Sequence, residues 1–140
     1  MGISEAELRK ILGPAYDELV TKGKVKRSKF GNKKTVVDGR RFDSLLEAKR
    51  YKELAALVRA GELMDVLCHT PTIRFPGTNI TYTLDFLVVA KDWTFWMEDV
   101  KGHQTKEWKM KWKMARALHP NLDMRFLLRK GDGWDVRIDV

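Results

Sequence analysis

The stretch ITYTLDFLVVAKDWTFWMEDVKG, residues 80–102, decides the fold of this 140-residue chain. Its residues at 80–90 and 94–101 are mostly β-branched, aromatic or aliphatic, which is typical of strands. Only the short segment 91–93 separates the two runs, and its length suits a hairpin loop. We therefore expect two neighbouring antiparallel strands joined by a hairpin.

The acids of this stretch fall on particular faces of the two strands. Because side chains alternate along a strand, Asp99 and Lys101 project from one face of the second strand and Glu98 from the other. Asp85 is the only charged residue of the first strand, and a three-residue loop places it directly opposite Asp99. Like charges so placed repel each other, so this pair needs a cation. A loop one residue shorter or longer would pair Asp85 with Glu98 or Val100 instead.

A third acid, Glu47, lies in a helix expected over residues 44–62, where apolar residues recur with helical period. Glu47 falls on the apolar stripe of this helix, together with Tyr51 and Leu54, so it points toward the core or a cleft. A structural explanation competes with this one. Ser44 and Glu47 have capping-box spacing, in which Glu47 reaches back to the Ser44 backbone N–H. We favour the functional role, because the paired strand acids need a cation.

Three carboxylates and a lysine that converge on one spot predict a Mg²⁺ site, in which Mn²⁺ can substitute. These hard cations take oxygen ligands, keep several waters and are commonly completed by substrate phosphates. Beside such a metal, Lys101 would orient or deprotonate an attacking water, or stabilise the charge that develops on the phosphoryl group. The structural alternative for Asp99 and Lys101 is an ion pair on one face of a strand.

The remaining segments predict a mixed α/β or α+β domain, with a central mixed β-sheet flanked by helices. The Asp38-Gly39 pair between two short runs indicates a two-residue hairpin turn, and Gly61 marks the end of the helix that carries Glu47. A further helix is expected over about 105–118. Extended segments are expected at 63–68, 72–75, 124–128 and 134–138.

The net charge of +8, from 27 basic and 19 acidic side chains, favours a polyanionic partner such as nucleic acid or an anionic membrane surface. Seven basic residues and no acidic one fall in KGKVKRSKFGNKK, residues 22–34, which we expect to form a basic arm. A short helix is expected before it, because Ser4 and Glu7 have capping-box spacing. The helix at 105–118 carries a second basic stripe, for which a solvated face is the alternative explanation.

The single cysteine, Cys68, excludes an intrachain disulfide and a Cys-rich zinc site, which favours a reducing compartment. The longest strictly apolar run, 86–90, is far too short to span a membrane, and the chain opens without an apolar signal core. We therefore expect a soluble, cytoplasmic protein with no membrane partner. Tryptophans can stack on nucleic-acid bases, but we expect the five in this chain to fill the core.

The order of the candidate residues resembles the PD-(D/E)xK nuclease superfamily: a glutamate on a helix, an aspartate on a strand, an Asp-x-Lys motif on the next strand, and a basic helix. In this chain these residues are Glu47, Asp85 and Asp99-Val100-Lys101. Within the superfamily, the chain is most similar to small phage-encoded and archaeal-type Holliday junction resolvases, over residues from about 30 to 127. It departs from their pattern where Leu84 replaces a proline and where Asp99 replaces the usual glutamate.

This resemblance implies a restriction-endonuclease-like nuclease domain over residues 30–140, preceded by an N-terminal helix and basic arm at 1–29. It further implies Mg²⁺-dependent hydrolysis of DNA phosphodiester bonds that leaves a 5′-phosphate. For junction-resolving members it implies a homodimer that places paired nicks in a four-way junction. The implied metal ligands are Glu47, Asp85, Asp99 and the Val100 carbonyl. Lys101 is the implied catalytic lysine.

Basic residues from two parts of the chain are the candidates for DNA contact. Phosphate contacts position a protein without reading sequence, so recognition of DNA shape is favoured over base readout. Two other functions stay open: a nickase or other branched-DNA endonuclease with the same site, and a non-catalytic DNA-binding module that keeps the nuclease fold. The candidate DNA-binding residues are Lys29, Lys33, Lys34, Arg40, Arg41, Lys106, Lys109 and Lys113.

Overall fold

The computed structural model describes residues 6, 10 and 34–140. Apart from residues 6 and 10, the predicted N-terminal helix lies outside the described residues, as does most of the basic arm, including Lys29 and Lys33. The predicted domain boundary after residue 29 lies there too and stays a prediction. The chain divides into two compact units, residues 1–48 and 49–140, and each unit is described by itself.

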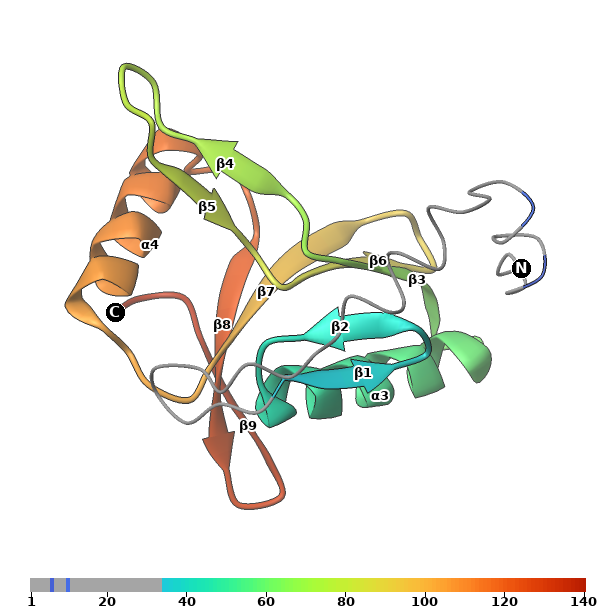
Figure 1. Ribbon diagram of the computed structural model, residues 1–140. Coiled ribbons are helices and arrows are strands. Elements are labelled where there is room, and N and C mark those ends of the chain that lie inside the picture. The colour runs from blue at the N-terminus through green and yellow to red at the C-terminus, as the bar shows by residue number, and fades with distance from the viewer. Residues whose placement is uncertain (1–5, 7–9, 11–33) are drawn as a thin grey trace. The chain divides into compact units, whose positions relative to one another are not determined.

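The described part of the first unit is a β-hairpin followed by the start of a helix. Strands β1 (Thr35–Val37) and β2 (Arg40–Phe42) pair antiparallel. Asp38 and Gly39 between them have φ angles of 51° and 74°, the left-handed conformation that a two-residue type I′ turn requires. The hairpin predicted from the Asp-Gly pair is therefore confirmed (Figure 1).

Helix α3 (Leu45–Arg59) begins in the first unit and continues in the second. It ends in a glycine cap, because Gly61 has a φ angle of 75° and the Glu62 N–H donates to the Leu57 carbonyl at 2.9 Å. Leu54, on the predicted apolar stripe, is fully buried. The predicted helix and its end at Gly61 are therefore confirmed.

The second unit is built on a five-stranded sheet (Figure 1). The strands of this sheet are β3 (Leu63–Cys68), β6 (Phe86–Ala90), β7 (Phe95–Lys101), β8 (Met124–Lys130) and β9 (Gly133–Arg137). Helix α4 (Lys106–Leu118) follows β7 in the chain. In the strand order β3-β6-β7-β8-β9, neighbours are antiparallel except β7 and β8, whose parallel pairing needs the crossover that α4 supplies. The predicted mixed α+β fold with a central mixed sheet is confirmed. Among the described residues, no helix is long and apolar enough to cross a membrane.

The predicted strand at 80–90 is wrong as a single element. It is divided into β5 (Thr81–Thr83), which pairs with β4 (Thr72–Arg74) in a separate two-stranded sheet, and β6 in the central sheet. The chain changes hydrogen-bond partners at the Leu84-Asp85 pair between the two strands. Buried and more exposed side chains alternate on both sides of this point, so the sequence pattern carries no sign of the change.

The hairpin between β6 and β7 has the predicted three-residue loop. Residues 91–93 form it, and a backbone hydrogen bond of 2.8 Å closes its base. The ladder pairs Phe86 with Glu98. The predicted register is therefore confirmed from Phe86 to Val89. Asp85 precedes β6 and donates its backbone N–H to the Glu98 carbonyl at 3.1 Å, so its pairing with Asp99 stays a prediction.

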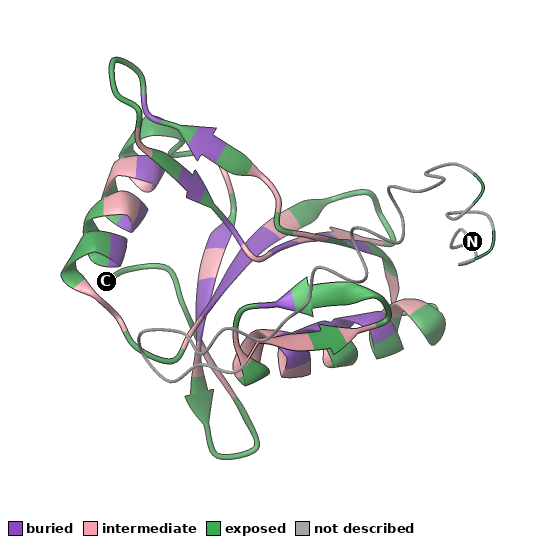
Figure 2. Ribbon diagram, in the orientation of Figure 1, coloured by how far each residue is buried: buried purple, intermediate pink, exposed green. Residues whose placement is uncertain are grey.

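The core between α4 and the central sheet is rich in aromatic rings, and buried residues gather on the inner side of α4 (Figure 2). The ring centroids of Trp108 and Trp112 lie 5.1 and 5.2 Å from that of Phe126 on β8, both edge to face. The prediction that tryptophans fill the core is confirmed for Trp108 and Trp112. It is wrong for Trp93, which is 72% exposed at the tip of the β6–β7 hairpin.

Candidate functional site

Strand β7 carries two buried acids next to each other. Glu98 and Asp99 are exposed by only 2% and 1%, and no other charged side chain of the described residues is buried. Their side chains point to opposite faces of the strand, as predicted, and each has its own set of partners. We name these faces the α4 face, which carries Asp99 and Lys101, and the Arg50 face, which carries Glu98.

On the α4 face, three donors hold the carboxylate of Asp99. Its Oδ1 lies 3.1 Å from the ammonium of Lys101, whose side chain is 26% exposed. Its Oδ2 accepts hydrogen bonds from the Trp108 indole N–H at 2.9 Å and from the Tyr82 hydroxyl. Asp99 and Lys101 therefore come together on one face, as predicted, and they form the ion pair that the structural alternative describes.

Asp85 lies beside the same stretch of β7. It is half-buried, and its Oδ2 accepts the Val100 backbone N–H at 2.7 Å, so its carboxylate reaches the peptide group that directly follows Asp99. Burial raises the pKa of the Tyr82 hydroxyl far above its usual value, and the negative charges of Asp99 and Asp85 raise it further. Tyr82 therefore keeps its proton and acts as a donor between two acids.

Glu47 lies in the first unit, where it takes part in the N-terminal cap of α3. The Glu47 N–H donates to Ser44 Oγ at 3.1 Å, as in a capping box. The Glu47 carboxylate accepts the Asp43 N–H at 3.4 Å, one residue before the expected Ser44 N–H. The Ser44 half of the predicted capping box is thus confirmed, whereas the Glu47 carboxylate binds the Asp43 N–H in place of the predicted Ser44 N–H. The convergence of Glu47 with Asp85 and Asp99, which belong to the second unit, stays a prediction.

Of the described basic residues predicted to contact DNA, all but Lys34 lie on β2 and α4, and Lys34 directly precedes β1. The three lysines of the α4 stripe are exposed, and the stripe's fourth member, Arg116, lies 3.8 Å from Asp139. The predicted basic stripe is confirmed as a surface feature, whereas its contact with DNA stays a prediction. The exposed candidates are Arg40 and Arg41 on β2 and Lys106, Lys109 and Lys113 on α4, and Lys34 is half-buried.

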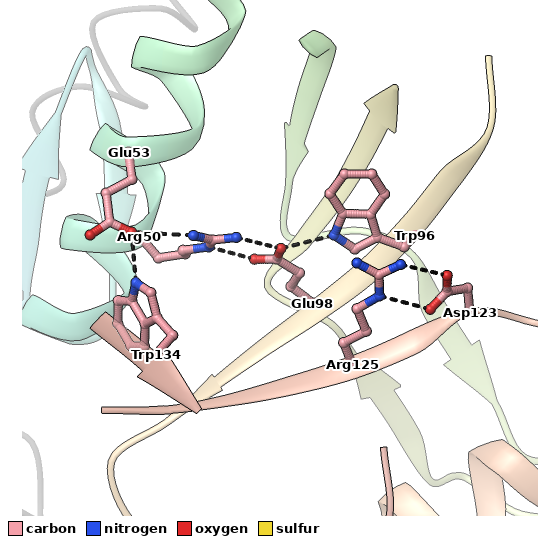
Figure 3. A network of polar contacts seen from close by, with 7 residues as sticks. All are labelled: Arg50, Glu53, Trp96, Glu98, Asp123, Arg125 and Trp134. Atoms are coloured by element: carbon pink, nitrogen blue, oxygen red, sulfur yellow. Dashed lines mark hydrogen bonds and ion pairs between the residues drawn. The ribbon is translucent and has the colours of Figure 1, made fainter. Parts of the chain in front are cut away.

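On the Arg50 face, a two-pronged ion pair holds Glu98, and this contact was not predicted from the sequence. Arg50 of α3 donates from Nε and Nη2 to the two carboxylate oxygens of Glu98, each at 2.8 Å. The Trp96 indole N–H donates to the same carboxylate at 2.9 Å (Figure 3). One signal was present: Glu98 shares its strand face with Trp96 and Val100, and an acid on an apolar face needs a partner.

The network on this face continues through two further residues of the sheet (Figure 3). The Arg125 guanidinium lies 4.6 Å from the centroid of the Trp96 ring and makes two hydrogen bonds to Asp123, at 3.0 and 2.8 Å. Trp134 donates its indole N–H to Glu53 at 2.6 Å. Charged and aromatic groups thus satisfy one another on the Arg50 face, which suits a structural role.

The oxygen atoms of Asp85 and Asp99 are of the chemical type that binds a hard divalent cation. Both side chains are carboxylates, and the neighbouring Val100 carbonyl is a further oxygen donor of the type that Mg²⁺ prefers. Among the described residues, no three His, Cys, Asp or Glu side chains are grouped closely enough to hold a metal ion. The predicted set of three carboxylate ligands therefore stays a prediction.

These features define a mixed α+β domain whose central strand carries an Asp-x-Lys motif with a buried aspartate and a partly exposed lysine. The chain belongs to the family described as "Protein of unknown function (DUF1064)", whose model matches residues 27–132. The matched region contains the β1–β2 hairpin, both described helices and every strand through β8. No curated protein and no solved structure matches the chain.

Proposed function

We propose that the protein is a metal-dependent endonuclease that cuts branched DNA, and that it resolves four-way (Holliday) junctions by paired nicks. One observation carries this proposal, the arrangement of Asp85, Asp99 and Lys101. The Asp85 carboxylate lies 2.7 Å from the Val100 N–H, next to Asp99, and the Lys101 ammonium lies 3.1 Å from Asp99 Oδ1. Two carboxylates beside the same stretch of β7 and a partly exposed ammonium are groups that metal-assisted hydrolysis of a phosphodiester uses.

The order of elements supports a restriction-endonuclease-like core as part of this proposal. A helix precedes strands β3, β6 and β7, and α4 then connects β7 to the parallel strand β8. The Asp-x-Lys motif stands on β7, the middle strand of the sheet. The same order of helix, strand acid, Asp-x-Lys strand and following helix underlies the resemblance to PD-(D/E)xK nucleases.

Each residue of the proposed site has a separate task. Mg²⁺ would be held by Asp85, Asp99, Glu47 and the Val100 carbonyl, and when bound it supplies Lewis-acid activation of the phosphoryl oxygen. Asp99 is buried and fixes where the Lys101 ammonium stands. The partly exposed end of Lys101 then stabilises the negative charge that develops on the phosphate in the transition state.

The exposed lysines of α4 supply the proposed DNA surface beside this site. Lys106 begins the helix shortly after Lys101, and Lys109 and Lys113 follow on the same stripe. We expect them to contact phosphates that flank the cut, with the basic arm and the β1–β2 hairpin as a second contact. Because paired nicks require two sites, the proposed active species is a homodimer, working in the cytoplasm.

Cleavage of four DNAs by the purified protein with Mg²⁺ tests the proposal. The substrates are a four-way junction, a fork, a duplex and a single strand of the same sequence. We expect symmetric paired nicks in the junction alone. Unpaired nicks or cuts in other branched DNAs would reassign the protein to a nickase or other branched-DNA endonuclease. Binding without any cleavage would reassign it to a non-catalytic DNA-binding module.

The Asp99→Asn variant separates catalysis from folding. The amide keeps the shape of the side chain and can still accept hydrogen bonds from Tyr82 and Trp108. We expect cleavage to fall by on the order of 10³-fold, the equivalent of several kcal/mol of lost metal assistance, while junction binding stays nearly unchanged. Joint loss of folding and binding would instead assign Asp99 a structural role.

A further inference from the structure

We infer that Tyr82 and Trp108 are positioning residues of the proposed metal site. Together they clamp one oxygen of Asp99 and leave its other oxygen to Lys101 and a cation. This inference rests on the proposed nuclease function and adds two residues that the Asp-x-Lys pattern does not contain.

The clamp acts on the orientation of the Asp99 carboxylate. Rotation of a carboxylate about its bond to the chain is only weakly restricted, so an unassisted aspartate does not fix its two oxygens. Here both donors meet the same oxygen, because the Trp108 N–H lies 2.9 Å from Oδ2 and the Tyr82 hydroxyl also donates to it. Trp108 Nε1 lies 3.0 Å from the Tyr82 hydroxyl as well, so the three groups form a closed triangle.

Trp108 acts on the catalytic lysine as well as on the acid. The Lys101 ammonium lies 5.5 Å from the centroid of the indole ring, within the range of a cation–π interaction. The edge of one indole thus orients Asp99, and its ring attracts Lys101. The start of α4 fixes this indole, since Thr105 Oγ1 caps the helix by accepting the Trp108 backbone N–H at 3.1 Å.

Burial makes the clamp hard to replace by water. Tyr82 and Trp108 are each only 6% exposed, and hydrogen bonds to a charged acceptor are strong where the dielectric is low. Two aromatic side chains can fill a core without directing the Tyr82 hydroxyl and the Trp108 indole N–H to the same carboxylate oxygen. Trp112 shows the contrast, because it is fully buried in the same cluster but donates its indole N–H to the Ile138 carbonyl at 2.9 Å.

Three substitutions test the clamp: Tyr82→Phe, Trp108→Phe and the matched control Trp112→Phe. Mn²⁺ binding by the metal-free protein is measured by isothermal titration calorimetry, and junction cleavage is measured over a range of Mg²⁺ concentrations. We expect Tyr82→Phe and Trp108→Phe to weaken Mn²⁺ binding and to raise the half-saturating Mg²⁺ concentration by about 10- to 100-fold, as loss of a partner of a metal ligand does. Trp112→Phe should change neither quantity. Thermal unfolding by circular dichroism reports the stability of each variant.

The possible outcomes separate the clamp from the nuclease function. If the wild type cuts junctions and Asp99→Asn is inactive, yet Tyr82→Phe binds Mn²⁺ like the wild type, the clamp is wrong and the nuclease stands. Equal losses in all three variants, in step with their stability, would also overturn it. A wild type that neither binds Mn²⁺ nor cuts DNA would overturn both proposals. Because Tyr82→Phe removes a single oxygen, it decides the matter even if Trp108→Phe does not fold.

Discussion

The two faces of β7 hold neighbouring acids in different ways. Glu98 is bound by Arg50, which donates to both carboxylate oxygens at 2.8 Å and is itself 17% exposed. Asp99 is bound by two neutral donors on one oxygen and by Lys101, a single point charge at 3.1 Å, on the other. The planar arginine saturates its acid, whereas the flexible lysine leaves Asp99 with a fixed position and an exchangeable counter-ion.

This difference shows that burial of an acid does not by itself indicate function. Glu98 and Asp99 are similarly buried, yet the counter-ion of Asp99 is a single, more exposed ammonium, whereas Arg50 binds both oxygens of Glu98. A closed arginine pair suits the attachment of a helix to a sheet. An acid held by neutral donors suits a place where a cation enters.

The largest expected effect follows from removing the arginine of the Arg50 face. Arg50→Ala leaves Glu98 buried without its counter-ion, so we expect the free energy of unfolding to fall by about 3–5 kcal/mol, measured by urea unfolding. The matched control combines Arg50→Met with Glu98→Met. It removes both charges together and should recover most of the loss, since well-packed apolar replacements of buried ion pairs are often neutral. A control as unstable as Arg50→Ala would contradict this account.

The next effect is on the α4 face and concerns rate. We expect Lys101→Ala to slow junction cleavage by about 10²- to 10³-fold, because it removes a charge that stabilises the transition state. Its cost in stability should be smaller than that of Arg50→Ala, since the Lys101 side chain is 26% exposed and water can solvate Asp99 in its place. Single-turnover cleavage and urea unfolding of the two variants check this order. Equal destabilisation by Lys101→Ala and Arg50→Ala would contradict the expected difference between the two faces.

The same chemical change on both faces sharpens the comparison further. Trp96→Phe removes the indole donor to Glu98, while Arg50 still binds both carboxylate oxygens. We expect a loss of about 1.5 kcal/mol in the free energy of unfolding, and no change in cleavage rate. Trp108→Phe on the α4 face should impair cleavage at limiting Mg²⁺. Urea unfolding and junction cleavage are measured for both variants. A cleavage defect in Trp96→Phe would contradict the expected difference between the two faces.

The smallest expected effect concerns the outer surfaces of the two helices. Lys109→Gln on α4 should lower the slope of log binding constant against log salt for a junction by about 0.9, the share of one phosphate contact. Lys52→Gln on α3 also removes an exposed positive charge and should leave the slope unchanged. Fluorescence anisotropy at several salt concentrations measures both slopes. Equal reductions in the two variants would show that the net charge, rather than the α4 stripe, governs binding.

Features that depend on neighbouring residues could be predicted from the sequence. The Asp38-Gly39 turn, the helix end at Gly61 and the three-residue loop at 91–93 each follow from local backbone preferences. The loop length then set the register of β6 and β7, in which Phe86 lies opposite Glu98. For this reason the pairing of β6 with β7 could be predicted, whereas the pairing of β5 with β4 could not.

Features that depend on distant segments could not be predicted. Arg50 and Glu98 are 48 positions apart, and no spacing rule joins a helix to a particular strand face. Trp108 was expected only as a core residue and no role was predicted for Tyr82, because the sequence does not show where an indole N–H or a hydroxyl points. The break between β5 and β6 has the same cause, since it depends on which strand supplies the partners.

The exposed tip of the β6–β7 hairpin also provides the protein with an optical reporter. Trp93 is 72% exposed, whereas the other four tryptophans are buried or half-buried. Acrylamide quenches exposed indoles before shielded ones, so the quenchable part of the intrinsic fluorescence comes chiefly from Trp93. A partner that approaches this loop can therefore be detected as a loss of quenching, without any added label.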